Sequence, residues 1–177
     1  MTSDKIVRKI AVIFVTDVVG FSKLMEKNED ATLKSLRACR DILDRLFEEH
    51  GGRIFNTAGD SVLAEFQSAV SAVICATEFQ KLIKQRNPSV AEAAQMRVRL
   101  GLNMGDVIVE GTNLYGDGVN VAARLEALSQ PGGVSLSKAI HDFVSQKVEL
   151  TFADLGSQKV KNTVLHAYDV TIDGLEE

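Results

Sequence analysis

The chain has 177 residues, of which 45% are hydrophobic and 25% are charged, a composition typical of one globular domain that buries its own core. Its net charge of −4 argues against a broad basic surface for nucleic acid, so we expect no nucleic-acid partner and only a small nucleotide, if any. Cys39 and Cys75 form no CxxC pair, and we expect both to be core residues of a reduced compartment.

The longest purely apolar run covers residues 10–15, far fewer than the roughly 20 that a membrane helix needs. No signal peptide precedes this run, so we expect a cytoplasmic protein with no direct membrane insertion. No linker or repeat divides the chain. We therefore expect one domain over residues 6–172, with short tails at 1–5 and 173–177.

The first half of the chain alternates strand and helix patterns. A short apolar run over 9–17 is typical of a buried strand and ends at an aspartate. Apolar residues at helical spacing predict a helix over 30–49, which His50-Gly51-Gly52 ends. A hairpin over 53–66 turns at Ala58-Gly59-Asp60, and Ser68 is a candidate cap for a helix that runs to Asn87.

The second half contains shorter elements. Residues 96–111 alternate and predict a second hairpin that turns at Gly105-Asp106, followed by a helix over 117–128. Short strands near 134–137, 150–152 and 167–172 and a small helix near 138–144 complete the pattern. Neighbouring hairpins with interspersed helices predict an α+β domain with a mainly antiparallel sheet. We expect the aspartates Asp106 and Asp117 to serve turns and the histidines His50, His141 and His166 to be isolated structural or solvent-facing residues.

The segment TDVVGFS, residues 16–22, follows the first predicted strand. It places Asp17 at the end of that strand, before a glycine-containing turn and a helix start. A carboxylate there can bind Mg²⁺ while the amides of the turn and the helix start face a phosphate. The alternative is that Asp17 only caps the helix.

A second carboxylate, Asp60, lies at the tip of the predicted first hairpin. If that hairpin lies beside the first strand, Asp60 and Asp17 share one edge of the sheet. Two carboxylates there repel each other unless a divalent cation lies between them. Taken by itself, however, Asp60 is better explained as a turn residue, and only its pairing with Asp17 favours a cation site.

The segment YGDGVNVAARLE, residues 115–126, is the most specific. On a helix, Asn120 and Arg124 are four residues apart and therefore on one face, where an amide and a guanidinium can meet the same ligand. A surface helix with routine arginine–glutamate pairing also explains Arg124, but it does not explain the small residues before Asn120. The chain contains no phosphate-binding P-loop, dinucleotide, zinc-protease or nucleophile-elbow motif.

Together these segments resemble a known family. TDVVGFSKLM, FNTAGDSVLAEF, GLNMGDVIVEG and YGDGVNVAARLEALSQPGGV are similar, in order and spacing, to the class III nucleotide cyclase catalytic domain of the bacterial adenylate/guanylate cyclase branch. The resemblance implies a ferredoxin-like α+β fold and a head-to-tail homodimer with active sites in the interface. It also implies attack of the 3′-hydroxyl of a nucleoside triphosphate on its α-phosphorus, which yields a 3′,5′-cyclic monophosphate and pyrophosphate.

The resemblance carries over to individual residues. Asp17 and Asp60 match the aspartates that bind two Mg²⁺ or Mn²⁺ ions, and the backbone of the following turn matches the segment that holds a metal and the phosphates, which is Val18, Val19, Gly20, Phe21 and Ser22. Asn120 and Arg124 match the pair that positions the ribose and stabilises the transition state. Lys161 matches, more loosely, a phosphate-binding lysine.

The two base-reading positions depart from the adenylate cyclase pattern. The family's usual lysine is Asn56 here, and its usual aspartate partner is Asn113. Replacing both members of a charged pair leaves no buried charge without a partner. The two asparagines therefore predict a neutral pocket with looser base selection. Amides donate and accept, so the pocket suits adenine or, after a flip, guanine.

Three functions remain open on the sequence. The first is an active cyclase that acts on ATP. The second is a cyclase-like dimerisation or nucleotide-sensing module without turnover. The third is a guanylate or dual-specificity cyclase, which the neutral pocket allows. The presence of Asp17, Asp60, Asn120 and Arg124 together favours an enzyme, because a binding module has no evident use for transition-state groups.

Overall fold

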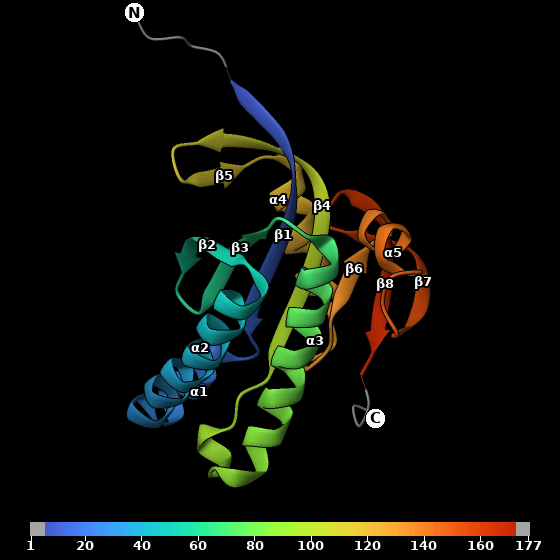
Figure 1. The fold of residues 1–177 in the computed structure, drawn as a ribbon. Coiled ribbons are helices and arrows are strands. Elements are labelled where there is room, and N and C mark those ends of the chain that lie inside the picture. Colours follow the sequence, from blue (N-terminus) through green and yellow to red (C-terminus); the bar gives the residue numbers. More distant parts are fainter. Residues whose placement is uncertain (1–5, 173–177) are drawn as a thin grey trace, which may run out of the picture.

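The computed structural model describes residues 6–172, so both predicted tails lie outside the described residues. It contains eight strands and five α-helices (Figure 1). The strands are β1 (Val7–Val18), β2 (Gly52–Ala58), β3 (Ser61–Phe66), β4 (Val98–Glu110), β5 (Asn113–Tyr115), β6 (Ser135–Ser137), β7 (Thr151–Val160) and β8 (Thr163–Thr171). The helices are α1 (Phe21–Lys27), α2 (Glu29–His50), α3 (Ala69–Arg86), α4 (Asp117–Leu128) and α5 (Lys138–Val144), with 3₁₀ turns at Asn87–Ser89 and Glu92–Ala94.

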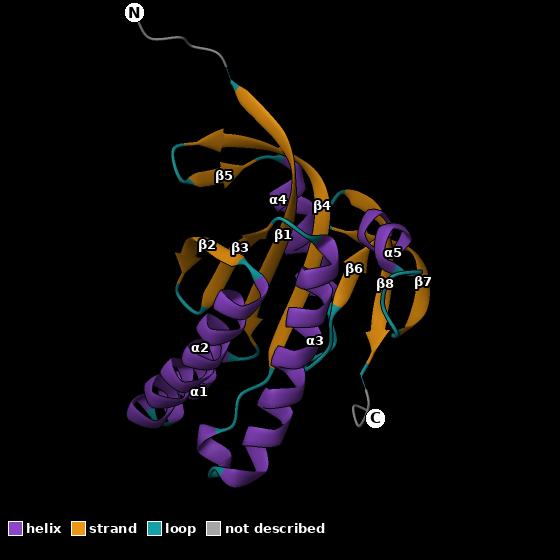
Figure 2. Cartoon of the chain, viewed as in Figure 1, coloured by secondary structure: helices purple, strands orange, loops and turns teal. Residues whose placement is uncertain are grey.

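The strands form one sheet in the order β2-β3-β1-β4-β6-β8-β7, and β5 pairs with the C-terminal end of β4. All pairings are antiparallel except β4 with β6. Helices α2 and α3 cover one face of the sheet, and α4 lies against the other (Figure 2). This arrangement confirms the predicted α+β class with a mainly antiparallel sheet.

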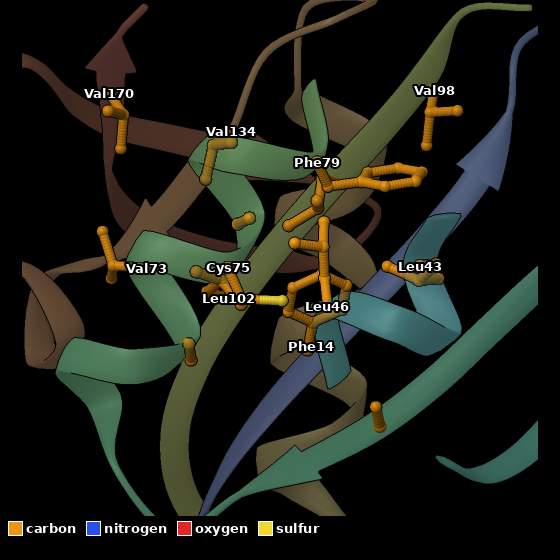
Figure 3. Close-up of a cluster of buried hydrophobic side chains, with 14 of the residues drawn as sticks. Phe14, Leu43, Leu46, Val73, Cys75, Phe79, Val98, Leu102, Val134 and Val170 are labelled. Atoms are coloured by element: carbon orange, nitrogen blue, oxygen red, sulfur yellow. The ribbon is translucent and has the colours of Figure 1, made fainter. Parts of the chain in front are cut away.

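Alternation along β1 divides the core between the two faces of the sheet. Val12 and Phe14 pack with α2 and α3, whereas Ile13 and Val15 pack with α4. Figure 3 shows Phe14, Leu46 and neighbouring side chains of the larger core between the sheet and the helices. Because both faces of β1 are buried, the chain after it emerges from a rigidly held strand end.

Local capping chemistry sets the ends of the long helices. The Asn28 side chain accepts from Ala31 N at 3.0 Å at the start of α2, and Ser68 accepts from Ser71 N at 3.1 Å at the start of α3. Gly51 ends α2 in the left-handed conformation. The predicted Ser68 cap and the glycine stop are confirmed. None of the helices within residues 6–172 is both long and apolar enough to cross a membrane.

The predicted position of the turn in the second hairpin was wrong. Strand β4 runs without a break through Gly105 and Asp106, and the chain turns only at 111–112. Asp106 pairs with Ile10 and forms an ion pair with Arg8 at 2.7 Å, so it is a strand residue and not a turn residue. Asp117 is likewise the first residue of α4.

Gly101 of β4 serves close packing against α4. A Cβ atom on Gly101 would lie 2.3 Å from the backbone nitrogen of Glu126 and 2.6 Å from the carbonyl oxygen of Ala122. Glycine at this position lets α4 lie directly on the strand.

The C-terminal strands are longer than predicted. The predicted strand near 150–152 is β7, which extends to Val160 and forms a hairpin with β8, whereas α5 has the predicted bounds. The histidines there are not isolated. His141 stacks on Tyr168 with ring centroids 3.7 Å apart, and His166 lies on the same ring and bonds to Asp154 at 2.6 Å.

Candidate active site

Strand pairing brings Asp17 and Asp60 to one place. β3 pairs antiparallel with β1 so that Val62 lies opposite Thr16, and the turn before β3 therefore reaches the end of β1. Asp60 Oδ2 accepts a hydrogen bond from Val18 N at 2.7 Å. This bond ties the hairpin tip to the residue that follows Asp17.

The Asp60 carboxyl group lies close enough to Asp17 to affect the ionisation of Asp17. Burial and a hydrogen bond with Asp60, together with the charge of Asp60, raise the pKa of Asp17 to about 6. An aspartate is disfavoured as an anion where a second carboxylate faces it without a cation between them. The donor set of two carboxylates beside strand-end backbone suits a hard divalent cation such as Mg²⁺ or Mn²⁺.

Two charged residues near this pair were missed by the sequence reasoning. Burial and the charge of Asp17 raise the pKa of Glu126, in the last turn of α4, to about 7. Arg99 lies opposite Asp17 on the paired strand β4, and its guanidinium opposes both of these shifts. Only the register between β1 and β4 reveals Arg99, and no local motif marks it.

The turn after Asp17 has a fixed backbone. Val19 N donates to Arg97 O at 2.8 Å, and Gly20 has a φ of 63°, a left-handed conformation that favours glycine. Phe21 and Ser22 then begin α1, where the first amides of a helix have no partner within the helix. The predicted turn and helix start are thus present beside Asp17 and Asp60.

Asn120 and Arg124 lie on the outer side of α4. The inner side of this helix, with Ala122 and Leu125, is fully buried, whereas Asn120 is exposed and Arg124 is half-buried. Among residues 6–172, no side-chain hydrogen bond or ion pair holds either residue. The structure therefore confirms that the two share a helix at four-residue spacing, and no hydrogen bond or ion pair from residues 6–172 occupies their side chains.

Asn56 is placed by an irregularity in β2. The pairing of β2 with β3 shifts between Ile54 and Asn56, so Asn56 lies opposite Leu63. Such a bulge re-aims the side chains that follow it. Without the shift, the Asn56 side chain would point to the opposite face of the sheet, because side chains alternate along a strand.

Asn113 begins β5, which contacts β2. The Arg53 guanidinium joins the two segments by donating to Thr112 O at 2.7 Å. Asn113 Oδ1 accepts from Leu114 N at 2.9 Å, and its Nδ2 donates to the Tyr115 hydroxyl at 3.0 Å. The segments of Asn56 and Asn113 are thus neighbours, but no hydrogen bond joins the two side chains within the described part of the chain.

Lys161 lies apart from the acidic pair. It is exposed in the turn between β7 and β8, with a φ of 56°. In the sheet order, β4 and β6 separate β1 from the β8–β7 hairpin. One copy of the chain therefore does not bring Lys161 to Asp17 and Asp60.

A model of the adenylate and guanylate cyclase catalytic domain family matches residues 3–171. The chain belongs to this family. The match covers nearly the whole chain. It includes Asp17 and Asp60, Asn56 of β2, Asn113 of β5, and Asn120 and Arg124 of α4.

Individual relatives agree. The chain is 44% identical over 163 residues to a putative adenylate cyclase 3 of Rhizobium meliloti (strain 1021). The aligned region covers 92% of this chain but only 28% of that protein. The chain thus spans less than a third of that curated relative. It is similar to the solved adenylate/guanylate cyclase/hydrolase of Silicibacter pomeroyi, with a TM-score of 0.87, 37% identity, and coverage of 96% of this chain and 100% of the other.

The likeness extends to more distant structures. The adenylyl cyclase CyaB of P. aeruginosa matches with a TM-score of 0.80 at 24% identity, covering 94% of this chain and 96% of the other. At that identity the match supports the fold alone. These neighbours establish the class III cyclase fold for this chain.

Proposed function

We propose that the chain is a nucleotide cyclase that converts ATP to 3′,5′-cyclic AMP and pyrophosphate in signal transduction. The observation that carries this proposal is the meeting of Asp17 and Asp60 at the end of β1, where Asp60 is fixed by Val18 N at 2.7 Å. A structural turn has no need to hold two carboxylates together with the pKa of one raised to about 6.

The residues fit a metal-assisted displacement. Bound by Asp17, Asp60 and the backbone of Val18, two Mg²⁺ or Mn²⁺ ions would supply a more acidic 3′-hydroxyl and neutralise the triphosphate. The turn and helix start over 19–22 would receive phosphate oxygens. A new bond forms between the 3′-oxygen and the α-phosphorus, the bond from that phosphorus to the pyrophosphate oxygen breaks, and the hydroxyl proton leaves to solvent.

Asn120 and Arg124 would act on the same reaction at the acidic pair of a second copy of the chain. Asn120 would orient the ribose, and Arg124 would stabilise the charge that grows on the α-phosphoryl oxygens. Neither side chain has a hydrogen bond or ion pair among residues 6–172, and β4 and β6 separate the acidic pair from the β8–β7 hairpin that carries Lys161. A head-to-tail homodimer would bring these three residues of one copy to Asp17 and Asp60 of the other.

One observation favours GTP as a second candidate substrate. The Asn113 oxygen accepts from Leu114 N, and one hydrogen of its NH₂ group is donated to the Tyr115 hydroxyl, so the second NH₂ hydrogen and the Tyr115 hydroxyl hydrogen remain as donors. A donor suits O6 of guanine, which accepts, better than the N6 amino group of adenine, which donates. The proposal of ATP is supported by the name of the Rhizobium relative, whereas the Silicibacter neighbour carries both activities in its name.

Metal-dependent turnover tests the proposal. Purified protein at high concentration is incubated with Mn²⁺ or Mg²⁺ and with ATP or GTP in parallel, and the cyclic nucleotide is quantified. Asp60→Asn is the matched variant, because its amide oxygen can still accept from Val18 N. Loss of a metal ligand that contributes about 4 kcal/mol lowers the rate about a thousandfold.

Cyclic product that depends on metal and falls in Asp60→Asn supports the cyclase. The ratio of products then ranks ATP against GTP. No product from either nucleotide, with a dimer present by light scattering, would contradict the cyclase and favour a domain that only dimerises or senses nucleotide.

A further inference from the structure

Glu65 is a buried carboxylate held between two cations. It lies in β3 directly opposite Arg53 of β2, and its side chain is only 6% exposed. Arg53 Nη2 donates to Glu65 Oε1 at 2.8 Å, and Lys9 Nζ of β1 lies 2.5 Å from Oε2. Because a buried charge is costly unless it is paired, this carboxylate anchors the Arg53 guanidinium to the sheet.

The Arg53 guanidinium has a second partner outside the β2–β3 hairpin. Its Nη1 donates to Thr112 O at 2.7 Å, in the turn between β4 and β5. Within residues 6–172, no other side-chain hydrogen bond joins this hairpin to the segment over 108–116. A guanidinium holds its donor groups in one rigid plane, so its anchor at Glu65 sets where the turn is held.

The carbonyl group that accepts from Arg53 belongs to the peptide bond between Thr112 and Asn113. The hydrogen bond therefore fixes the planar backbone unit from which the Asn113 side chain starts. Asn56 lies three residues after Arg53 on the same strand, beyond the bulge that follows Ile54. One side chain thus connects the two segments that carry the candidate base-reading residues.

The two asparagines are not bonded to each other. No hydrogen bond joins Asn56 to Asn113 in the described part of the chain, and β5 is only three residues long. Hydrogen bonds weaken steeply as their geometry departs from the ideal. A pocket built from two neutral amides therefore depends on how firmly β2 and β5 are held together.

We propose that Arg53, anchored by Glu65, is a positioning residue for recognition of the purine base. It holds the peptide bond before Asn113 at a fixed place relative to β2 and does not itself need to contact the base. The role in recognition rests on the proposed function, whereas the restraint on the turn does not. A purely structural role would affect every ligand alike, so experiment separates the two.

Arg53→Lys is the decisive variant. Lysine keeps a positive charge beside Glu65 but lacks the two separate nitrogens that reach Glu65 and Thr112 O together. Arg45→Lys is the matched control, because it makes the same substitution at an exposed position of α2. The Arg45 side chain has no hydrogen bond or ion pair within residues 6–172.

Hydrogen exchange measures the restraint on the turn without any ligand. In Arg53→Lys, peptides that cover residues 110–116 should exchange about fivefold faster, the factor expected from one lost hydrogen bond. Peptides that cover β3 should be unchanged, because Lys9 still pairs with Glu65. Unchanged exchange over 110–116 overturns the proposed restraint.

Nucleotide binding measures the consequence for base recognition. The probe is 3′-deoxy-ATP, which lacks the attacking hydroxyl and is not cyclised, and inorganic tripolyphosphate carries the phosphates without a base. With Mn²⁺ present, Arg53→Lys should weaken binding of 3′-deoxy-ATP about fivefold and leave tripolyphosphate unchanged, and Arg45→Lys should change neither. In turnover, the KM for ATP should rise about fivefold while kcat stays unchanged.

Glu65→Gln tests the anchor. It should weaken binding of 3′-deoxy-ATP in the unmodified background and have no further effect in Arg53→Lys, because Glu65 acts on the base only through the Arg53 guanidinium. Additive losses in the double variant would contradict the anchoring role.

Equal weakening of 3′-deoxy-ATP and tripolyphosphate in Arg53→Lys overturns the positioning role, as does no weakening of either. Cyclic product with an unchanged KM in Arg53→Lys overturns this inference and keeps the proposed function. Selective loss of 3′-deoxy-ATP affinity in a protein that makes no cyclic nucleotide keeps the inference and contradicts the proposed function. Absence of 3′-deoxy-ATP binding to the unmodified chain contradicts both.

Discussion

The acidic end of β1 and the outer side of α4 differ in how far one copy of the chain fixes their side chains. Asp60 is bonded to Val18 N, and both Asp17 and Asp60 are partly buried. Asn120 and Arg124 have no side-chain partner among residues 6–172, although their helix is packed so closely that Gly101 has no room for a Cβ atom. One copy thus holds the acidic pair in place and presents Asn120 and Arg124 on a rigid helix.

This difference is what a site shared between two copies requires. In the proposed dimer, the acidic pair would have to be assembled before a nucleotide arrives, because two carboxylates approach each other only at a cost. In the proposed dimer, Asn120 and Arg124 would need a rigid helix but no internal partner, because they would act on the nucleotide held by the other copy. The predictions below test this division.

The largest expected effect comes from complementation between copies. Asp17→Ala and Arg124→Ala should each lose activity, the second by about a hundredfold to a thousandfold. Mixed and refolded together at equal amounts, they should recover about a quarter of normal activity, because half of the dimers are mixed and each mixed dimer has one intact site of two. Product formation by the mixture is the measurement.

A mixture of Asp17→Ala with Asp60→Asn is the control, since each chain then lacks part of the acidic half and no intact site forms. If the Asp17→Ala and Arg124→Ala mixture stays inactive while mixed dimers are isolated with two different tags, the division between copies is wrong.

Proton competition should weaken metal binding at the acidic end. With a pKa of about 6, Asp17 is ionised at about pH 7 and protonated at about pH 5. One competing proton lowers the apparent affinity for Mn²⁺ about tenfold over that interval. Titration of Mn²⁺ by electron paramagnetic resonance at both pH values measures the change.

Glu126→Gln separates this effect from the neighbouring carboxyl group, whose pKa burial raises to about 7. The variant should keep the tenfold dependence. A dependence that disappears in Glu126→Gln would assign the competing proton to Glu126 and contradict the assignment to Asp17.

The base-reading positions should respond to restored charge. Asn56→Lys combined with Asn113→Asp should raise the preference for ATP over GTP about fivefold, because hydrogen bonds to charged groups contribute about 1 kcal/mol more than neutral ones. The kcat/KM ratio for the two nucleotides is the measurement. Thr57→Lys, which adds the same charge at the next exposed position of β2, should leave the ratio unchanged. An unchanged ratio in the double variant would sink the neutral-pocket hypothesis.

The smallest effect concerns the network that holds β2 near β5. Burial alone would raise the pKa of Glu65, but hydrogen bonds from Lys9 and Arg53 outweigh it and lower the pKa below its ordinary value of 4.5. Glu65 therefore stabilises the fold at neutral pH, and this stabilisation is lost as the pH falls through its lowered pKa. Lys9 and Arg53 are 40% and 46% exposed, so screening keeps the contribution to about 1 kcal/mol.

Glu65→Gln should lower the free energy of unfolding by about 1 kcal/mol at about pH 7, and the difference should shrink in acid. Urea unfolding at neutral and acidic pH measures both values. Glu48→Gln, on an exposed position of α2, is the control. A difference that grows as the pH falls would contradict the lowered pKa.

Sequence reasoning found most of the candidate site because its signals are local. The apolar run that stops at Asp17, the Gly59-Asp60 turn and the spacing of Asn120 and Arg124 each depend on neighbouring residues. It missed Arg99 and Glu126, which approach Asp17 only through strand register and helix packing. It also missed the bulge before Asn56, because nothing in the local pattern shows that the pairing slips there.

The sequence by itself determined the mixed fold, the ends of the long helices, the acidic residue at the end of β1 and the resemblance to nucleotide cyclases. Only the tertiary structure decided that β4 passes straight through Gly105-Asp106, that Val18 N fixes Asp60, and that Arg53 joins Glu65 to the turn between β4 and β5. The physical reason is range. Turn and cap preferences act over a few residues, whereas register and close packing join residues as distant as Arg8 and Asp106, 98 positions apart.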